Sequence, residues 1–162
     1  MGIVTYSIEC NNDETLMNVL GVSKKVIKHS GNKTRVLKYL LKNEDAIGMV
    51  DEDPESYQVD LSNYDFIKNF PTEIDLYKKK NSTDLLIVLK PELEPWILKA
   101  SRIAKLNLKD YNLPEDAKKF KIIMAHKNRD VMKFLKDLNE KSEYFSQLRK
   151  ILHSELKIEN II

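Results

Sequence analysis

Apolar residues recur at two spacings along the first 50 residues, and the two spacings alternate. Where β-branched and aromatic residues alternate with polar ones, or form a short unbroken run, the pattern predicts a strand. Where apolar residues recur three and four positions apart, it predicts a helix. The resulting order of strand, helix, strand, helix, strand is typical of an α/β domain with crossover helices. These elements are predicted at residues 3–8, 16–20, 26–27, 36–41 and 46–50.

The middle of the chain has a less regular pattern. Residues 85–89 are apolar throughout, as expected of a strand buried on both faces of a parallel sheet, and residues 91–104 predict a helix with Trp96 on its buried face. Residues 55–71 are predicted to be irregular, and residues 73–79 fit either an edge strand or a helix. We therefore expect an α/β fold with a mostly parallel sheet of about four strands flanked by helices.

The last third of the chain is amphipathic and rich in lysine, which predicts helices. We expect two parts, an α/β domain in residues 1–112 and a helical C-terminal extension in residues 113–162 that packs on it. The three helical segments of the extension are 115–125, 129–139 and 143–157.

Composition narrows the class of protein. The chain has 162 residues, 42% of them hydrophobic, which suits a soluble globular protein. Its apolar runs fall far short of the ~20 residues that cross a bilayer. Cys10 is the only cysteine, so an internal disulfide and a cysteine cage for zinc are excluded. No basic segment precedes the first strand, and we expect no signal peptide, no membrane association and a cytoplasmic location.

Charge divides the chain unevenly. Residues 1–75 contain 8 Lys and Arg against 13 Asp and Glu, a balance of −5, whereas residues 76–162 contain 19 against 12, a balance of +7. An acidic first half and a basic second half suggest a cation site beside a surface that attracts a polyanion. The alternative is that the lysine-rich helices simply present a solvated face.

Acidic residues follow two of the predicted strands. Glu9 ends the first strand, and Asp51 and Asp53 end the third. Side chains at positions i and i+2 of an extended segment point the same way, so Asp51 and Asp53 could share an ion, with Glu52 facing away. Ligands of parallel sheets bind beyond the carboxyl ends of the strands. Oxygen ligands without Cys or His favour Mg²⁺ or Mn²⁺; the alternative is an ordinary acidic turn.

Three short segments together resemble a Toprim domain, the catalytic fold of topoisomerases, bacterial primases and several small nucleases. They are Tyr6-Ser7-Ile8-Glu9 followed by Asp13, then His29-Ser30-Gly31, then Ile47 to Asp53. The resemblance covers roughly residues 3–100. It implies a fold of about four parallel strands between helices and Mg²⁺-dependent phosphoryl transfer on nucleic acid.

The resemblance also implies roles for individual residues. Glu9 would be a general acid/base or a metal ligand, Asp51 and Asp53 would be metal ligands, and Asp13 would match an acidic residue of the nuclease-type members. Glu94, in Leu89 to Trp96, would be an additional acidic site residue. The chain has Cys10-Asn11 where the family usually has glycine after the glutamate, and it lacks the glycine that usually follows the D-x-D.

Basic residues could bind the phosphates of such a substrate. Lys33 and Arg35 lie at a predicted helix start, and Lys90 lies at a strand end. The lysines at 78–80 and 118–121 offer non-specific attraction. For each of these, a solvated surface role is the alternative.

We therefore expect a Mg²⁺- or Mn²⁺-dependent nuclease that acts on DNA or RNA. The alternatives are a non-catalytic Toprim-fold module that binds nucleic acid or a partner protein, and an interaction protein with no such site.

Overall fold

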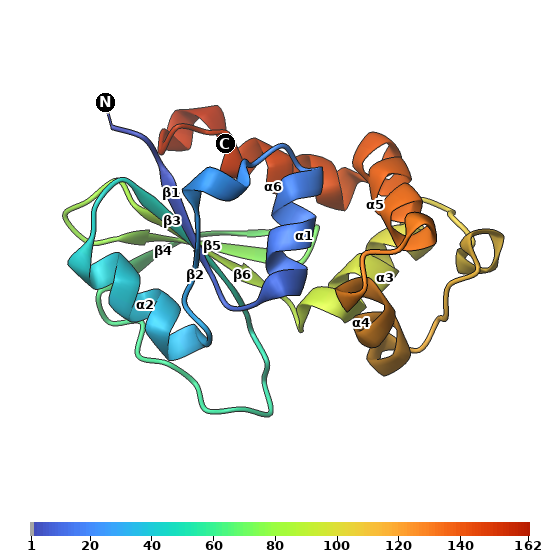
Figure 1. Ribbon diagram of the computed structural model, residues 1–162. Coiled ribbons are helices and arrows are strands. Elements are labelled where there is room, and N and C mark those ends of the chain that lie inside the picture. The colour runs from blue at the N-terminus through green and yellow to red at the C-terminus, as the bar shows by residue number, and fades with distance from the viewer. Residues whose placement is uncertain (1) are drawn as a thin grey trace.

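A computed structural model describes residues 2–162 and contains a six-stranded mixed sheet with helices on both faces (Figure 1). The strands are β1 (Thr5–Ile8), β2 (Ile27–His29), β3 (Ala46–Asp51), β4 (Tyr64–Phe70), β5 (Ile74–Lys79) and β6 (Leu85–Leu89). The helices are α1 (Asn11–Val19), α2 (Lys33–Lys42), α3 (Leu93–Ile103), α4 (Ala117–Ala125), α5 (Arg129–Lys141) and α6 (Glu143–Leu152), with short 3₁₀ turns at Lys24–Val26, Leu108–Tyr111 and Ile158–Asn160.

The order of strands across the sheet is β2-β1-β3-β6-β5-β4. The first four strands of this order are parallel, and β5 runs antiparallel to both β6 and β4. The predicted α/β class is thus confirmed, but a mostly parallel sheet of about four strands was wrong, because the sheet is mixed and has six strands.

Strand β4 accounts for much of this difference, because it lies within residues 55–71, which were predicted to be irregular. It is an edge strand, and a bulge between Phe66 and Lys68 shifts its register against β5. Only Tyr64 and Phe70, at its two ends, are buried, so its sequence lacks the regular alternation that identifies a strand. The ambiguous residues 73–79 form β5, which lies inside the sheet.

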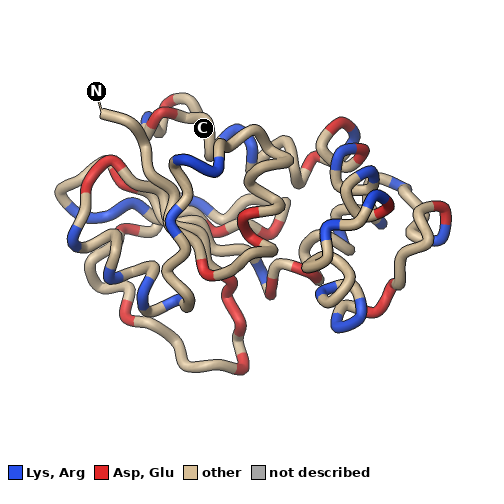
Figure 2. Tube along the Cα trace, in the orientation of Figure 1, with Lys and Arg blue, Asp and Glu red and all other residues tan. Residues whose placement is uncertain are grey.

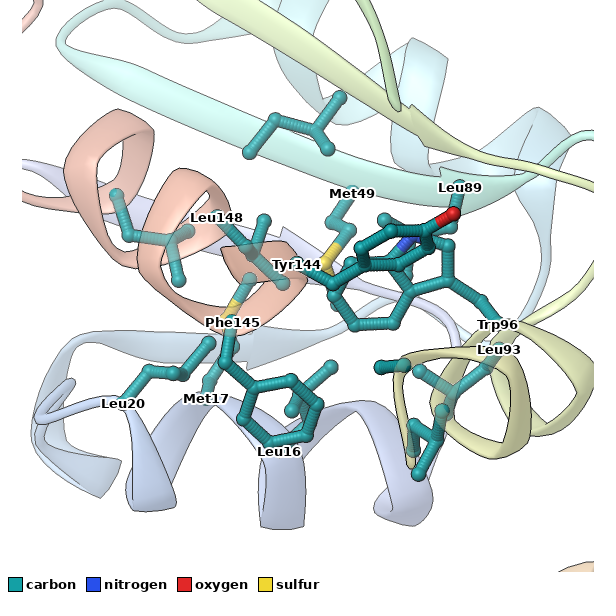
Figure 3. Close-up of a cluster of buried hydrophobic side chains, with 14 of the residues drawn as sticks. Leu16, Met17, Leu20, Met49, Leu89, Leu93, Trp96, Tyr144, Phe145 and Leu148 are labelled. Carbon is teal, nitrogen blue, oxygen red and sulfur yellow. The ribbon is translucent and has the colours of Figure 1, made fainter. Parts of the chain in front are cut away.

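One face of the sheet carries the larger part of the core, between the strands and helices α1, α3 and α6 (Figure 3). Trp96 of α3 is fully buried there, stacked on Phe145 of α6, and its indole N–H donates a hydrogen bond to the Thr72 carbonyl at 2.8 Å. The predicted core position of Trp96 is confirmed.

The other face is covered by α2 and by residues 52–63. Val36 and Leu40 of α2 pack directly on β3 at Gly48. A Cβ atom at this glycine would lie 2.7 Å from Leu40 Cδ1, so the close packing of helix on strand requires glycine here. Beyond α2, Val59 and Leu61 cover the remaining part of this face.

The C-terminal helices share the main core instead of forming a separate one. Phe120, Phe134 and Phe145 are fully buried in the same cluster as the side chains of α1 and α3. In addition, the Asn12 side chain of α1 donates a hydrogen bond to the Lys121 carbonyl of α4 at 3.2 Å. In residues 2–162 no helix has the length and apolar character needed to cross a membrane.

Candidate functional site

The first and third strands are neighbours, and this brings their acidic ends together. Strand β1 pairs with β3 in parallel, so Glu9 and Asp51 follow the strands at the same edge of the sheet. The backbone N–H of Asp51 donates a hydrogen bond to Glu9 Oε2 at 3.1 Å. Asp51 follows Ile47 and Met49 in the alternation of β3, so its side chain lies on the face that α1 and α3 cover.

A cavity of about 270 Å³ opens at this edge, and its lining is predominantly acidic. We call it the acidic pocket. It lies where the carboxyl ends of parallel strands meet the starts of α1 and α3, which is the usual ligand position in such sheets. Its lining consists of Glu9, Cys10, Asp13, Gly31, Asp51, Asp53, Glu92, Leu93, Glu94 and Lys121.

Asp51 is the acidic residue with the least compensation. Its Oδ1 atom is buried and has no hydrogen-bond partner among the described residues 2–162. Burial, together with the nearby Asp13 and Glu9 carboxylates, raises the pKa of Asp51 to about 8, while a hydrogen bond from the amide of Leu93 acts in the opposite direction. A carboxyl group in this position gains strongly from a neighbouring cation.

Asp13 has a structural task at the start of α1. It is only 2% exposed, and its Oδ2 accepts hydrogen bonds from the backbone N–H groups of Glu9 at 3.2 Å and Cys10 at 3.1 Å. Asp13 thereby caps the helix. Burial raises the pKa of Asp13 to about 7; the Cys10 amide lowers it and the Glu9 charge raises it. The residue predicted as a metal ligand is thus engaged on one oxygen as a helix cap.

Cys10 lies in the lining without the properties of a nucleophile. Its thiol donates to Asp13 Oδ2 at 3.6 Å, and burial together with the Asp13 charge raises the pKa of the thiol to about 11. The thiol is therefore protonated at neutral pH.

Glu9 and Glu94 are the other two carboxyls whose pKa is raised by burial. For Glu9, the Asp51 amide and Lys33 act against burial; for Glu94, which is 5% exposed, Lys121 and the Asn12 side chain do so. Lys121 is exposed and is the only lysine in the lining of the acidic pocket.

Asp53 reaches the acidic pocket by a different route from the predicted one. Strand β3 ends at Asp51, and Asp53 has a left-handed backbone with φ of 44° while its N–H donates to the Pro91 carbonyl at 2.8 Å. The assumption of an extended backbone from Asp51 to Asp53 was therefore wrong, although both line the acidic pocket. Glu52 lines a second cavity of about 110 Å³ on the α2 face, and Asp51 lines both cavities.

The predicted phosphate-binding residues lie outside the acidic pocket. Lys33 Nζ donates to the Glu52 carbonyl at 2.6 Å, which ties α2 to the segment after β3. Lys90 Nζ lies 3.4 Å from an Asp75 carboxylate oxygen. Arg35 is exposed in the first turn of α2, near the Gly31 turn that lines the pocket.

The residues of the acidic pocket fit a hard divalent cation in their chemistry. They offer carboxylate oxygens, including the unpartnered Asp51 Oδ1, and Mg²⁺ and Mn²⁺ prefer such ligands. However, within residues 2–162 no three His, Cys, Asp or Glu side chains are grouped so that they could already hold one ion. Side chains of the acidic pocket would have to turn toward an ion in order to bind it.

Sequence reasoning did not assign Glu92 or Lys121 to the pocket. Glu92 has no motif of its own, and Lys121 follows Glu9 by more than 100 residues, in a lysine-rich helix that resembles a solvated surface. The packing of α4 against α1 and α3 brings Lys121 to the pocket.

Comparison of the chain with protein-family models, with curated proteins and with solved structures found no match.

Proposed function

We propose that the protein is a Mg²⁺- or Mn²⁺-dependent phosphodiester hydrolase, a small Toprim-like nuclease that acts on DNA or RNA. The observation that carries this proposal is the carboxyl cluster of the acidic pocket, in which Asp51 Oδ1 is buried without a hydrogen-bond partner among residues 2–162. Buried carboxylates of like charge are costly without a cation, and strongly perturbed carboxyls in a cleft mark candidate functional sites.

In this proposal the carboxyl groups have different roles. Asp51, Asp53 and Glu9 would hold the metal, which when bound supplies Lewis acidity toward a phosphate oxygen. Glu9 has a raised pKa, so its carboxyl group is suited to proton transfer closer to neutral pH than an ordinary glutamate. Asp13 would keep α1 and Glu9 in position through its hydrogen bonds to the backbone at Glu9 and Cys10. Glu94 would be an additional acidic residue beside them.

Positive charge for the substrate would come from the rim of the acidic pocket. A phosphodiester brings its own negative charge to a pocket that is already acidic, so binding needs basic groups nearby as well as the metal. Lys121 is in the lining and Arg35 is exposed near the Gly31 turn. Lys33 and Lys90 would act at most from a distance, because each is engaged with another part of the chain.

A second candidate is a non-catalytic Toprim-fold module that binds nucleic acid or a partner protein. Two observations favour it. The chain has Cys10-Asn11 where the resemblance leads us to expect glycine, and in residues 2–162 no three potential ligands already surround one point. A module of this kind would retain the acidic pocket without cutting its ligand.

The two candidates separate in a cleavage assay on single-stranded and duplex DNA and RNA, with Mg²⁺, with Mn²⁺ or with chelator. We expect metal-dependent cutting by the wild type, and a loss of at least about a hundredfold in Asp51→Asn. Asp65→Asn is the matched control, because Asp65 is an exposed aspartate on the edge strand β4. Cutting that persists in Asp51→Asn, or in chelator, would contradict the proposal; no cutting with metal binding retained would favour the module.

A further inference from the structure

Helix α4, the turn after it and the first residue of α5 carry a run of basic residues that is flanked by Asp116 and Asp130 but contains no acidic residue. Residues 117–129 contain five Lys and Arg and no Asp or Glu. All five are exposed, and none has an ion-pair partner within 4.0 Å in the part of the chain that the structure describes. We call them the α4 ridge; they are Lys118, Lys119, Lys121, Lys127 and Arg129.

The α4 ridge begins at the acidic pocket. Lys121 lines the pocket, and the hydrogen bond from Asn12 to its carbonyl fixes α4 against the first turn of α1. At the other end of α4, Lys127 lies close enough to Glu14 of α1 to influence it: burial acts to raise the pKa of Glu14, but His29 and Lys127 outweigh it and lower that pKa. In Figure 2 the blue positions of α4 lie beside the red positions at the start of α3.

The second lysine-rich run of the sequence, 78–80, lies elsewhere and is largely engaged. Lys78 pairs with Leu85, at the opposite end of β6 from the acidic pocket. Lys79 is buried in an ion pair with Asp84, and Lys78 Nζ donates to the Ser82 carbonyl. Of the two lysine-rich segments, the α4 ridge is therefore the one that lies at the acidic pocket and has side chains free of ion pairs in the described residues.

We propose that the α4 ridge is the docking surface for the sugar-phosphate backbone of a nucleic acid and leads a strand from the C-terminal helices into the acidic pocket. The role of the pocket in this inference rests on the proposed function. An acidic pocket repels phosphates, so a strand needs a basic surface beside it. Four of the five residues are lysines, whose ammonium groups bind phosphates without regard to sequence.

An acidic protein is the other polyanion that such a ridge could attract. Protein interfaces are centred on apolar or aromatic anchors, and on α4 the only large hydrophobic side chain with high exposure is Ile122, at 63%. The balance of five unpaired cations to one apolar side chain favours a phosphate backbone.

Binding measured in chelator tests the ridge separately from cleavage. The probes are fluorescein-labelled 20-nucleotide DNA and RNA, single-stranded and duplex, followed by anisotropy over a range of salt. The variant K118A/K119A/K127A leaves Lys121 in place, and K38A/K42A/K80A removes the same charge from exposed lysines outside the ridge. We expect the ridge variant to bind about tenfold more weakly or worse, with the slope of log affinity against log salt reduced by about 2 for single strands. The control should stay within about twofold of wild type.

Two further measurements make the outcome decisive. The variant K118R/K119R/K127R should restore binding, because it restores the charge, and circular dichroism should show that all variants fold. Equal weakening in the two alanine variants, or stronger binding to poly-glutamate than to the oligonucleotides, would overturn the inference. If the wild type cuts no substrate with Mg²⁺ or Mn²⁺ but needs the α4 ridge for binding in chelator, the proposed function is rejected and the docking surface is retained.

Discussion

Charged side chains are buried at both ends of the parallel strands, and the two ends treat them differently. At the amino end, Lys79 and Asp84 lie 3.0 Å apart at Nζ and Oδ2. Lys79 Nζ also donates to the carbonyls of Leu40 and Asn43 at the end of α2, and Asp84 Oδ1 accepts from the Ala46 amide. Each charge therefore has an opposite charge and hydrogen bonds, as burial requires.

At the carboxyl end, buried groups of one sign face one another. Asp13 and Glu94 are 2% and 5% exposed, Asp51 Oδ1 has no partner, and the one lysine of the lining is exposed. In the ionised state this arrangement raises the free energy of the folded protein, which is why the pKa values of these carboxyls are raised. The paired end thus neutralises its buried charges within the chain, whereas the carboxyls of the acidic pocket have no buried cation beside them within residues 2–162.

The largest effect is expected from breaking the paired end. In Lys79→Met the apolar stem is kept, but Asp84 becomes a buried carboxylate without a counter-ion and two α2 carbonyls lose their donor. We expect a loss of about 3 to 5 kcal/mol in the free energy of unfolding at pH 7, measured by urea denaturation. Lys80→Met, at an exposed position, is the matched control and should change stability by less than about 0.5 kcal/mol.

The carboxyl end of the strands should make the protein less stable as the pH rises. The folded pKa of Asp51, about 8, lies above its ordinary value of 3.8, so its contribution to stability is fully present below pH 3.8 and is lost as the pH rises through 8. The contribution changes by about 1.4 kcal/mol per pH unit between the two pKa values, so in chelator the wild type should lose about 3 to 4 kcal/mol of unfolding free energy between pH 5 and pH 8 through Asp51, and Asp51→Asn should lack this loss. Urea titrations at each pH measure the unfolding free energy of the wild type and of Asp51→Asn. If the two depend on pH identically, Asp51 does not have a raised pKa in the folded protein.

A divalent cation should reduce the difference between the two ends. Mg²⁺ at ten times its dissociation constant would stabilise the wild type by about 1.4 kcal/mol, seen as a rise in Tm at pH 8. Asp51→Asn should show no such rise, whereas Lys80→Met should show it in full. An equal rise in Asp51→Asn would mean that the ion binds outside the acidic pocket.

The smallest effect is expected from loosening the contact between α1 and α4. Asn12→Ala removes the hydrogen bond to the Lys121 carbonyl and should cost about 1 kcal/mol of unfolding free energy. Asn69→Ala, which removes a hydrogen bond to Asp75 on the exposed side of β4, should cost less than half of that. If Asn12→Ala proves neutral in urea denaturation, other contacts hold α4 at the pocket.

Much of the fold could be predicted because its helices and parallel strands have strong local patterns. The apolar run 46–50 and the helical spacing of residues 36–41 predicted β3 and α2 to within a few residues. Strand β4 was missed, because an edge strand with a bulge buries only Tyr64 and Phe70 and carries no alternation to detect. Residues 73–79 were ambiguous because a short segment fits both periods.

Within the candidate site, the position of a residue at the end of a strand could be predicted from the sequence, but the contacts of its side chain could not. That Glu9 and Asp51 could meet followed from the expected parallel pairing of their strands, which the structure contains. The cap made by Asp13, the ion pair between Lys90 and Asp75, and the left-handed turn at Asp53 all depend on contacts made after folding. None of these is visible in residue types or spacing.

The α/β class, the helical C-terminal third and the acidic ends of two strands could be predicted because they depend on periodicity and on residues close together in the chain. The tertiary structure alone decided which carboxyls are left without partners, which lysines are engaged and where the C-terminal helices lie. Electrostatic free energy depends on distance and on burial, and two residues more than 100 positions apart, such as Asn12 and Lys121, acquire a distance only when the chain has folded.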